Sequence, residues 1–197
     1  MTALLAVVLA YLIGAIPFGY VLVRLKTGED VRSKGSGNIG ATNVLRTTGR
    51  AAAVATLVLD IGKGILAVWL AGKLTDHSPA AMSLAALAVM AGHAYPVFLK
   101  FRGGKAVASF IGAFLILTPV PLLAALLLFV VVVAATRHIS LGSIVAAGSL
   151  PLAVYLIEHP QPSVLIASVI AAGFIIYRHS ANIQRLRAGT EHVFRFK

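Results

Sequence analysis

Seven hydrophobic stretches separated by short polar segments are the feature that most constrains the fold of this 197-residue chain. They lie at about residues 2–23, 51–72, 79–99, 106–118, 121–136, 143–157 and 162–177. Only 12% of all residues are charged, whereas roughly a quarter are charged in soluble domains. Helices satisfy their backbone hydrogen bonds internally and can therefore cross lipid. The sequence predicts an all-α polytopic membrane protein with seven transmembrane helices, forming a single domain over residues 1–197.

The stretch 106–136 does not by itself reveal how often it crosses the bilayer. Thr118-Pro-Val-Pro121 is compatible with a turn between two short helices or a kink in one. Basic residues lie both before the stretch, at 100–105, and after it, at Arg137. If both ends are cytoplasmic, the segment must cross twice, or enter and return.

The basic residues predict the orientation. Of the 17 Lys and Arg residues, all but Lys63 and Lys73 fall on one side when the first loop is placed inside. Cytoplasmic loops are enriched in these residues, so we expect the N-terminus outside and the C-terminus in the cytoplasm, in the cell (inner) membrane. The segment 2–23 lacks a preceding positive region and is predicted to be a retained span and not a cleaved signal peptide.

The net charge of +11 fits cytoplasmic loops beside anionic lipid headgroups. No Arg-rich extramembrane domain is apparent, so we expect no nucleic-acid partner. The absence of cysteine excludes disulfides, thiolate nucleophiles and Cys-ligated metals. No metal or cofactor is predicted, because the four histidines outside the polar clusters have no ligand spacing: His77, His138, His159 and His192.

The first polar cluster is Ser33-Lys-Gly-Ser-Gly-Asn-Ile-Gly-Ala-Thr-Asn-Val-Leu-Arg46, with three glycines in six residues. Glycine lets the backbone turn its N–H groups toward a ligand, and short polar side chains add donors. Arginine supplies a planar charged fork suited to phosphate. The cluster predicts a site for a phosphorylated molecule, with candidate residues Ser36, Gly37, Asn38, Thr42, Asn43 and Arg46.

Two further clusters fall on the same predicted cytoplasmic side. In Gly92–Lys105, Gly103 and Gly104 are expected to open the next helix beside the point charge of Lys105. His93 is interpreted either as a substrate ligand or as an interfacial helix cap. In 177–191, helical spacing predicts Arg178, Asn182 and Arg185 on one face with His179 beside it. Clusters that bind the same anion would have to lie close together. The three clusters on one side therefore predict a single pocket.

The motifs Ser33-x-x-Ser-Gly-Asn-x-Gly-Ala-Thr-Asn-x-x-Arg46, Gly92-His-x-x-Pro-x-x-x-x-Phe-x-Gly-Gly-Lys105 and His179-x-x-Asn-Ile-x-Arg-Leu-x-x-Gly-x-Glu191 resemble those of the bacterial acyl-phosphate:glycerol-3-phosphate acyltransferase family. They occur in the same order over essentially the whole chain. The resemblance implies transfer of a fatty acyl group from acyl-phosphate to the sn-1 hydroxyl of glycerol 3-phosphate, without a CoA or acyl-carrier-protein donor. It implies that Ser36, Arg46, His179 and Asn182 are important for activity, that Gly103 and Gly104 contribute to substrate binding, and that Glu191 is more structural.

Acyl-phosphate is already activated, so the enzyme mainly has to bring together two anions, orient the hydroxyl and stabilise the oxyanion. The two anionic substrates repel one another, and the cationic side chains of Arg46, Lys105 and Arg185 are expected to offset that repulsion. The general base is either His179 or a phosphate oxygen of the donor, and we favour the donor. Ser36 is interpreted as a phosphate ligand in preference to a covalent nucleophile, because no base is evident beside it.

Asp60 and Lys63 lie inside a predicted span at i,i+3 spacing. An intramembrane carboxylate is a functional candidate by default, but the spacing favours a structural ion pair. The pair also supports a rival hypothesis, a small transporter of a phosphorylated metabolite. Transporters usually have repeats and a midplane site, whereas here we find no repeat and the polar motifs lie on one face. A non-catalytic lipid-binding scaffold would not need three phosphate-type motifs.

Overall fold

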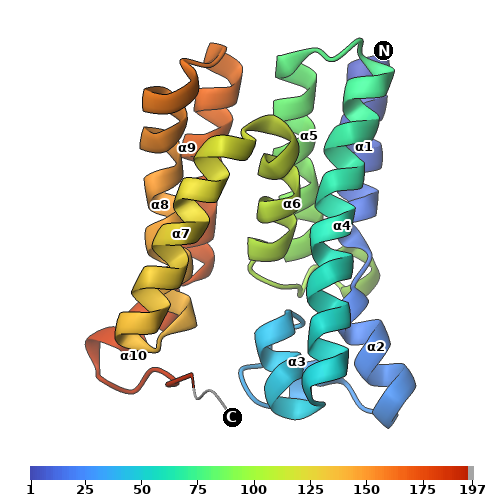
Figure 1. Ribbon diagram of the computed structural model, residues 1–197. Coiled ribbons are helices and arrows are strands. Elements are labelled where there is room, and N and C mark those ends of the chain that lie inside the picture. Colours follow the sequence, from blue (N-terminus) through green and yellow to red (C-terminus); the bar gives the residue numbers. More distant parts are fainter. Residues whose placement is uncertain (195–197) are drawn as a thin grey trace. The chain divides into compact units, whose positions relative to one another are not determined.

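The computed structural model describes residues 1–194, and all the regular structure in that range is helical (Figure 1). The chain forms two compact units, Met1–Leu117 and Thr118–Lys197. The first contains α1 (Thr2–Ala15), α2 (Phe18–Thr27), the 3₁₀ turn η1 (Val31–Ser33), α3 (Ala41–Thr47), α4 (Arg50–Leu74), α5 (Pro79–Ala94), the 3₁₀ turn η2 (Val97–Leu99) and α6 (Val107–Leu117). The second contains α7 (Pro119–Thr136), α8 (Ile139–Glu158), α9 (Pro162–Arg178) and α10 (Ser180–Arg187).

Each predicted hydrophobic stretch is mostly helical, as expected for an apolar run that must satisfy its own backbone. Five helical segments of the described chain are long and apolar enough to cross a membrane, or up to six if the bent pair α9–α10 counts as one span. The eleven-residue α6 is shorter than these. Seven crossings therefore stay a prediction. The stretch 106–136 forms two helices, because the backbone at Thr118 is not helical.

The first span is interrupted where Pro17 separates α1 from α2. Proline has no N–H to donate to the helix, and it restricts the residue before it to extended backbone. Ile16 is accordingly extended. The break exposes the Ile16 carbonyl, which accepts a hydrogen bond from Lys63 Nζ of α4 at 2.9 Å.

Glycines allow the helices of the first unit to approach closely. A Cβ at Gly14 of α1 would overlap the Val89 backbone of α5, and a Cβ at Gly92 of α5 would overlap the Tyr11 carbonyl of α1. The same relation holds between α4 and α6. Small residues at such crossings are the usual way for helices to pack in lipid, where no hydrophobic force drives them together.

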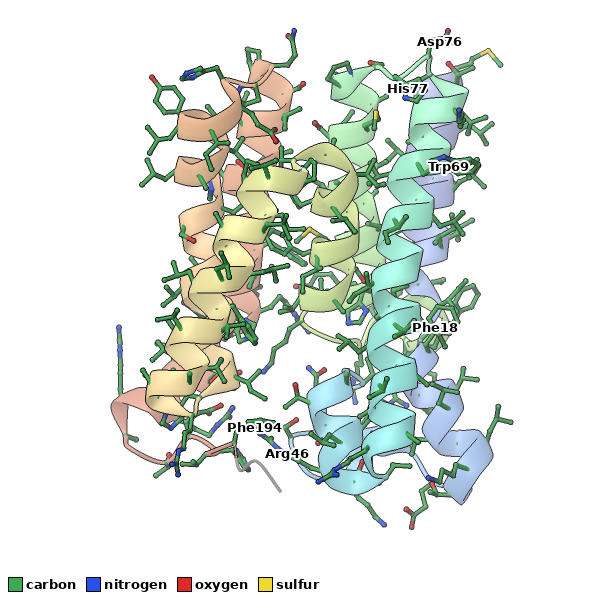
Figure 2. The ribbon with its side chains drawn as sticks, viewed as in Figure 1. Phe18, Arg46, Trp69, Asp76, His77 and Phe194 are labelled. Carbon is green, nitrogen blue, oxygen red and sulfur yellow. The ribbon has the colours of Figure 1, made fainter. Side chains whose placement is uncertain are left out.

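The two ends of the first unit carry different polar residues (Figure 2). At one end, α3 carries Arg46, and at the other, Asp76 and His77 lie in the turn after α4. Beneath the Arg46 end lies a small apolar core of Val23, Val31, Ile39, Val44, Ala52, Ala53 and Leu99. This core anchors the first polar cluster. In the second unit, α8 packs against both α7 and α9.

Candidate active site

The loop of the first cluster is organised by the buried amide of Asn43. The Asn43 side chain is 1% exposed, and its Oδ1 accepts a hydrogen bond from the Ser36 N–H at 2.8 Å. Its Nδ2 lies 2.8–3.1 Å from three backbone carbonyl oxygens, those of Val31, Lys34 and Asn38. One side chain thus contacts four backbone groups in and beside the loop, and its two N–H protons are shared among three carbonyl oxygens. Asn43, a predicted substrate ligand, is placed to shape this loop.

Glycines flank Ser36 because the loop turns through left-handed backbone there. Gly35 and Gly37 have φ of 60° and 68°, a region that residues with a Cβ seldom adopt. A Cβ at Gly35 would also overlap the Asn43 amide oxygen. The Ser36 side chain lies exposed on this turn, and Arg46 is exposed on α3. Thr42 and Asn38 are half-buried, and Asn38 Oδ1 accepts the Gly40 N–H at 2.8 Å.

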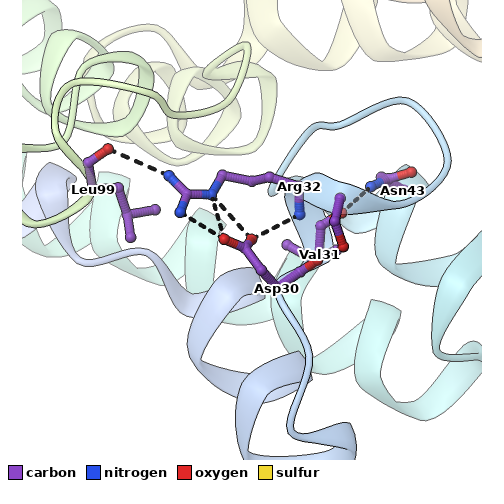
Figure 3. Close-up of polar contacts among 6 residues, drawn as sticks. Asp30, Val31, Arg32, Asn43 and Leu99 are labelled. Carbon is purple, nitrogen blue, oxygen red and sulfur yellow. Dashed lines mark hydrogen bonds and ion pairs between the residues drawn. The ribbon is translucent and has the colours of Figure 1, made fainter.

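An arginine that the sequence analysis did not select connects the first cluster to the second (Figure 3). Arg32 Nε and Nη2 donate to the Asp30 carboxylate, the shorter contact being 2.7 Å, and Arg32 Nη1 donates to the Leu99 carbonyl at 3.4 Å. The hydrogen bond from Arg32 lowers the pKa of Asp30 below its ordinary value, against the opposing effect of burial. Arg32 therefore links η1 to η2 at the same end of the unit.

The second cluster corrects one expectation about helix geometry. Gly103 and Gly104 were predicted to open the following helix, but α6 begins at Val107. Their N–H groups donate to the Ala94 and His93 carbonyls at 3.1 and 3.0 Å. These two amides close the end of α5 and do not form an anion site at a helix N-terminus. Lys105 follows this closed turn and is half-buried.

The predicted Asp60–Lys63 ion pair is confirmed, and His93 joins it. Lys63 Nζ lies 2.8 Å from Asp60 Oδ1, and His93 Nδ1 lies 3.6 Å from the same oxygen. All three side chains are at least 96% buried. His93 is therefore not an exposed cap; its buried imidazole, carried by α5, faces the Asp60 carboxylate of α4.

The third cluster is built around a bend that the sequence analysis missed. The chain bends by 57° between α9 and α10 at His179. The prediction of one helical face carrying Arg178, Asn182 and Arg185 was wrong for Arg178, because it belongs to α9 while the other two belong to α10. His179 is 3% exposed, and its Nδ1 lies 2.8 Å from the Ile175 carbonyl. A carbonyl only accepts, so Nδ1 carries a proton and Nε2 is the nitrogen that can exchange one.

Glu191 is the acceptor that holds the third cluster together. Its Oε1 accepts from Asn182 Nδ2 at 2.7 Å and from Ser140 Oγ at 2.9 Å, and its Oε2 accepts from Arg185 Nε at 2.7 Å. Burial raises the pKa of the Glu191 carboxyl, but the hydrogen bonds from Asn182, Arg185 and Ser140 outweigh it, and the pKa lies below its ordinary value. This geometry agrees with a structural role for Glu191.

Glu191→Gln is expected to lower the melting temperature most near neutral pH. A carboxyl with a lowered folded-state pKa stabilises the fold above its unfolded-state pKa, and that contribution is lost as pH falls through the folded-state pKa. The difference between wild type and variant should therefore shrink below about pH 4. Thermal unfolding in detergent at several pH values measures it. Glu29→Gln, which removes a surface pair with Lys34, is the control and should have little effect at any pH. A pH-independent difference for Glu191→Gln would contradict this account.

The structure thus brings the first two clusters together at one end of the first unit and places the third in the second unit. The predicted convergence of all three stays a prediction. Asp30, Arg32 and Ser140 were missed: the first two are single polar residues beside the first cluster, and Ser140 lies in α8, far in sequence from the cluster that it contacts. Within residues 1–194, no group of three or more His, Asp or Glu side chains is arranged to hold a metal ion.

Comparison with known proteins identifies relatives along the whole chain. The family model described as glycerol-3-phosphate acyltransferase matches residues 4–189. A glycerol-3-phosphate acyltransferase of Desulforamulus reducens is 48% identical over 96% of this chain and 94% of its own length. One from Geobacter sulfurreducens is 47% identical over 98% of this chain and 97% of its own.

Two solved structures are similar to the described fold. Both are crystal structures of PlsY (YgiH), an integral membrane glycerol 3-phosphate acyltransferase, in its glycerol 3-phosphate form and its lysophosphatidic acid form. The first is 39% identical with a TM-score of 0.93, and the second is 37% identical with a TM-score of 0.90. Each comparison covers 99% of this chain and 96% of the other.

Proposed function

Because the chain belongs to the glycerol-3-phosphate acyltransferase family, that of PlsY, we propose that it transfers a fatty acyl group from acyl-phosphate to the sn-1 hydroxyl of glycerol 3-phosphate. The products are 1-acylglycerol 3-phosphate (lysophosphatidic acid) and phosphate, and the reaction begins bacterial phospholipid synthesis. Family membership gives an integral membrane acyltransferase; the donor, the acylated position and the absence of an acyl-enzyme are our proposal. The two units serve this one reaction as a single acyltransferase domain.

The loop held by Asn43 is the observation that carries the proposal. It presents Ser36 between two left-handed glycines while a buried amide satisfies the loop backbone. Such a loop keeps its shape without a ligand, so the Ser36 hydroxyl is positioned in advance for a phosphate oxygen. Gly37, Asn38 and Thr42 belong to the same loop and the start of α3 and complete this binding surface.

The cations hold two phosphorylated substrates that repel one another. We assign Arg46 and Lys105 of the first unit and Arg185 of the second to the phosphates. Arg185 uses only Nε to bind Glu191, and its terminal nitrogens make no hydrogen bond within residues 1–194. Its side chain is 33% exposed. Glu191 thereby orients a guanidinium whose remaining donors are suited to phosphate. Asn182, held by the same carboxylate, is positioned with it.

The reaction proceeds by direct attack. The sn-1 oxygen of glycerol 3-phosphate bonds to the acyl carbon, the carbon–oxygen bond to phosphate breaks, and the hydroxyl proton goes to a donor phosphate oxygen, which leaves as phosphate. His179 orients the hydroxyl or the leaving phosphate through Nε2. The alternative is that His179 Nε2 takes the proton as the base. His179→Gln separates the two, because loss of a base removes the corresponding limb of the pH–rate profile, whereas loss of an orienting contact lowers the rate at every pH.

Ser36 serves as a ligand and not as a nucleophile. No base hydrogen-bonds to its Oγ among the described residues; its hydrogen bond to Asn43 is made by the backbone N–H. An unactivated serine is a weak nucleophile. Incubation with donor alone, followed by mass spectrometry, should therefore find no acyl-serine at position 36. Detection of that adduct would replace direct attack by a two-step mechanism.

The transporter hypothesis rested on the buried Asp60–Lys63 pair. In the structure Lys63 contacts Asp60 and the Ile16 carbonyl, so both members of the pair have partners within the protein. Purified protein in detergent has no compartments, so formation of lysophosphatidic acid there supports the enzyme. Uptake of glycerol 3-phosphate into proteoliposomes, with no lipid product in detergent, would instead support the transporter.

We place the site at the cytoplasmic face of the cell (inner) membrane, with the N-terminus outside. The chain has no cysteine, so single cysteines can report the orientation. Asp76→Cys, at the opposite end of the first unit from Arg46 (Figure 2), should react with a membrane-impermeant maleimide in right-side-out vesicles. Lys26→Cys, exposed at the end of α2, should react only after the vesicles are opened. The reverse pattern would invert the proposed topology.

A further inference from the structure

We infer that Asp60 is a positioning residue for the transfer reaction: its buried carboxylate holds His93 against Gly104 and so fixes the turn that carries Lys105. The inference rests on the proposed function for its kinetic readout. The residues involved belong to α4, α5 and the turn before α6, all within the first unit.

A contribution to stability does not by itself explain why two charged side chains are buried in this helix. Asp60 and Lys63 are 2% and 4% exposed, on a helix long and apolar enough to cross a membrane. Apolar side chains of the same size generally stabilise a protein as well as a buried ion pair does, or better. The pair therefore calls for an account beyond packing.

The pair connects two places that are distant in sequence. Lys63 Nζ donates to the Ile16 carbonyl at the break between α1 and α2, and Asp60 Oδ1 faces His93 Nδ1 across 3.6 Å. That distance exceeds an ordinary hydrogen bond, so the two groups are in polar contact, with Nδ1 of the imidazole facing the carboxylate of α4. Asp60 Oδ1 links the two, because it contacts both Lys63 Nζ and His93 Nδ1.

His93 in turn contacts the turn that contains Gly103 and Gly104. Its carbonyl accepts the Gly104 N–H at 3.0 Å, and a Cβ at Gly104 would overlap its imidazole. Gly104 therefore packs directly on the ring, and any shift of the ring moves the turn. Lys105, proposed to hold phosphate, is the next residue. The path from Asp60 to Lys105 thus passes through two contacts, imidazole on carboxylate and glycine on imidazole.

The test replaces the ion pair by neutral side chains of similar size, Asp60→Asn with Lys63→Met. This double variant leaves no unpaired charge and is expected to accumulate in the membrane with a melting temperature near that of wild type. Its KM for at least one phosphorylated substrate should rise about tenfold, with kcat changed far less. A variant that folds with wild-type KM values for both substrates would overturn the inference, because a purely structural pair predicts that result.

A second comparison tests the route through His93. His93→Leu should raise the same KM, and combining it with the neutral pair should add little, since both changes break one path. If the two changes instead raised KM independently, so that their effects multiplied in the combined variant, the route through His93 would be contradicted. If the neutral pair fails to accumulate, His93→Leu alone, which keeps the ion pair, carries the test by the same KM criterion.

Hydrogen exchange separates this inference from the proposed function. The Gly103 and Gly104 amides, which donate to the end of α5, should exchange about tenfold faster in the neutral-pair variant and in His93→Leu. This readout does not need turnover. Faster exchange in a protein that makes no lipid product would uphold the positioning and reject the function, whereas unchanged exchange would reject the positioning.

Discussion

Asn43→Asp is expected to lower kcat/KM for acyl transfer by at least about a hundredfold while the protein still accumulates. Aspartate has nearly the same shape and keeps the acceptor for the Ser36 N–H. It cannot donate, and it places a negative charge beside the carbonyls that Nδ2 now satisfies. A buried carbonyl without a donor is unfavourable, so the loop should move and misplace Ser36. Steady-state kinetics with purified protein measure the loss.

Asn38→Asp is the matched control for the stability of the loop. The side-chain oxygen of Asn38 accepts the Gly40 N–H, and aspartate retains that acceptor. Its melting temperature should stay near that of wild type, whereas that of Asn43→Asp should fall by several degrees. Activity of Asn43→Asp within a few-fold of wild type would show that the loop does not depend on this amide.

Arg46→Lys should lower kcat/KM by about a hundredfold even though the charge is kept. A single ammonium cannot reproduce the two parallel hydrogen bonds that a guanidinium makes to phosphate. Arg46 is exposed on α3, so the change should leave the fold intact. Kinetics with each substrate varied in turn show which phosphate it holds. Arg50→Lys, also exposed and four residues along, is the control and should behave as wild type. Equal, small effects of the two substitutions would contradict the proposed contact.

The helices were predictable from sequence because lipid leaves the backbone no other way to satisfy its hydrogen bonds. The first break was not predicted, although Pro17 marks it, because the hydropathy of the span continues across it. The bend at His179 was missed for a different reason. The residues on both sides are compatible with helix, and only the structure shows that the chain turns between Arg178 and Ser180.

At the candidate site, sequence indicated which residues are polar but not what they bind. Asn43 and Asn38 look equivalent in a glycine-rich loop, yet Asn43 is buried and contacts four backbone groups, whereas Asn38 accepts from one backbone N–H. Gly103 and Gly104 suggested an anion site, but their amides close α5. Spacing does predict the Asp60–Lys63 pair, since residues three apart lie on the same face of a helix; it gives no information about the contact with His93 on another helix.

The most direct test of the central claim is the choice of acyl donor by the purified protein. Glycerol 3-phosphate is supplied with either palmitoyl-phosphate or palmitoyl-CoA at equal concentration, and the lipid product is identified by mass spectrometry and by the position of its acyl group. Acyl-phosphate presents a compact dianion suited to cationic side chains such as Arg46 and Lys105, whereas the sequence offers no cluster suited to the nucleotide of CoA. We expect 1-acylglycerol 3-phosphate from palmitoyl-phosphate and essentially none from palmitoyl-CoA. Comparable rates from the two donors, or product from palmitoyl-CoA alone, would contradict it.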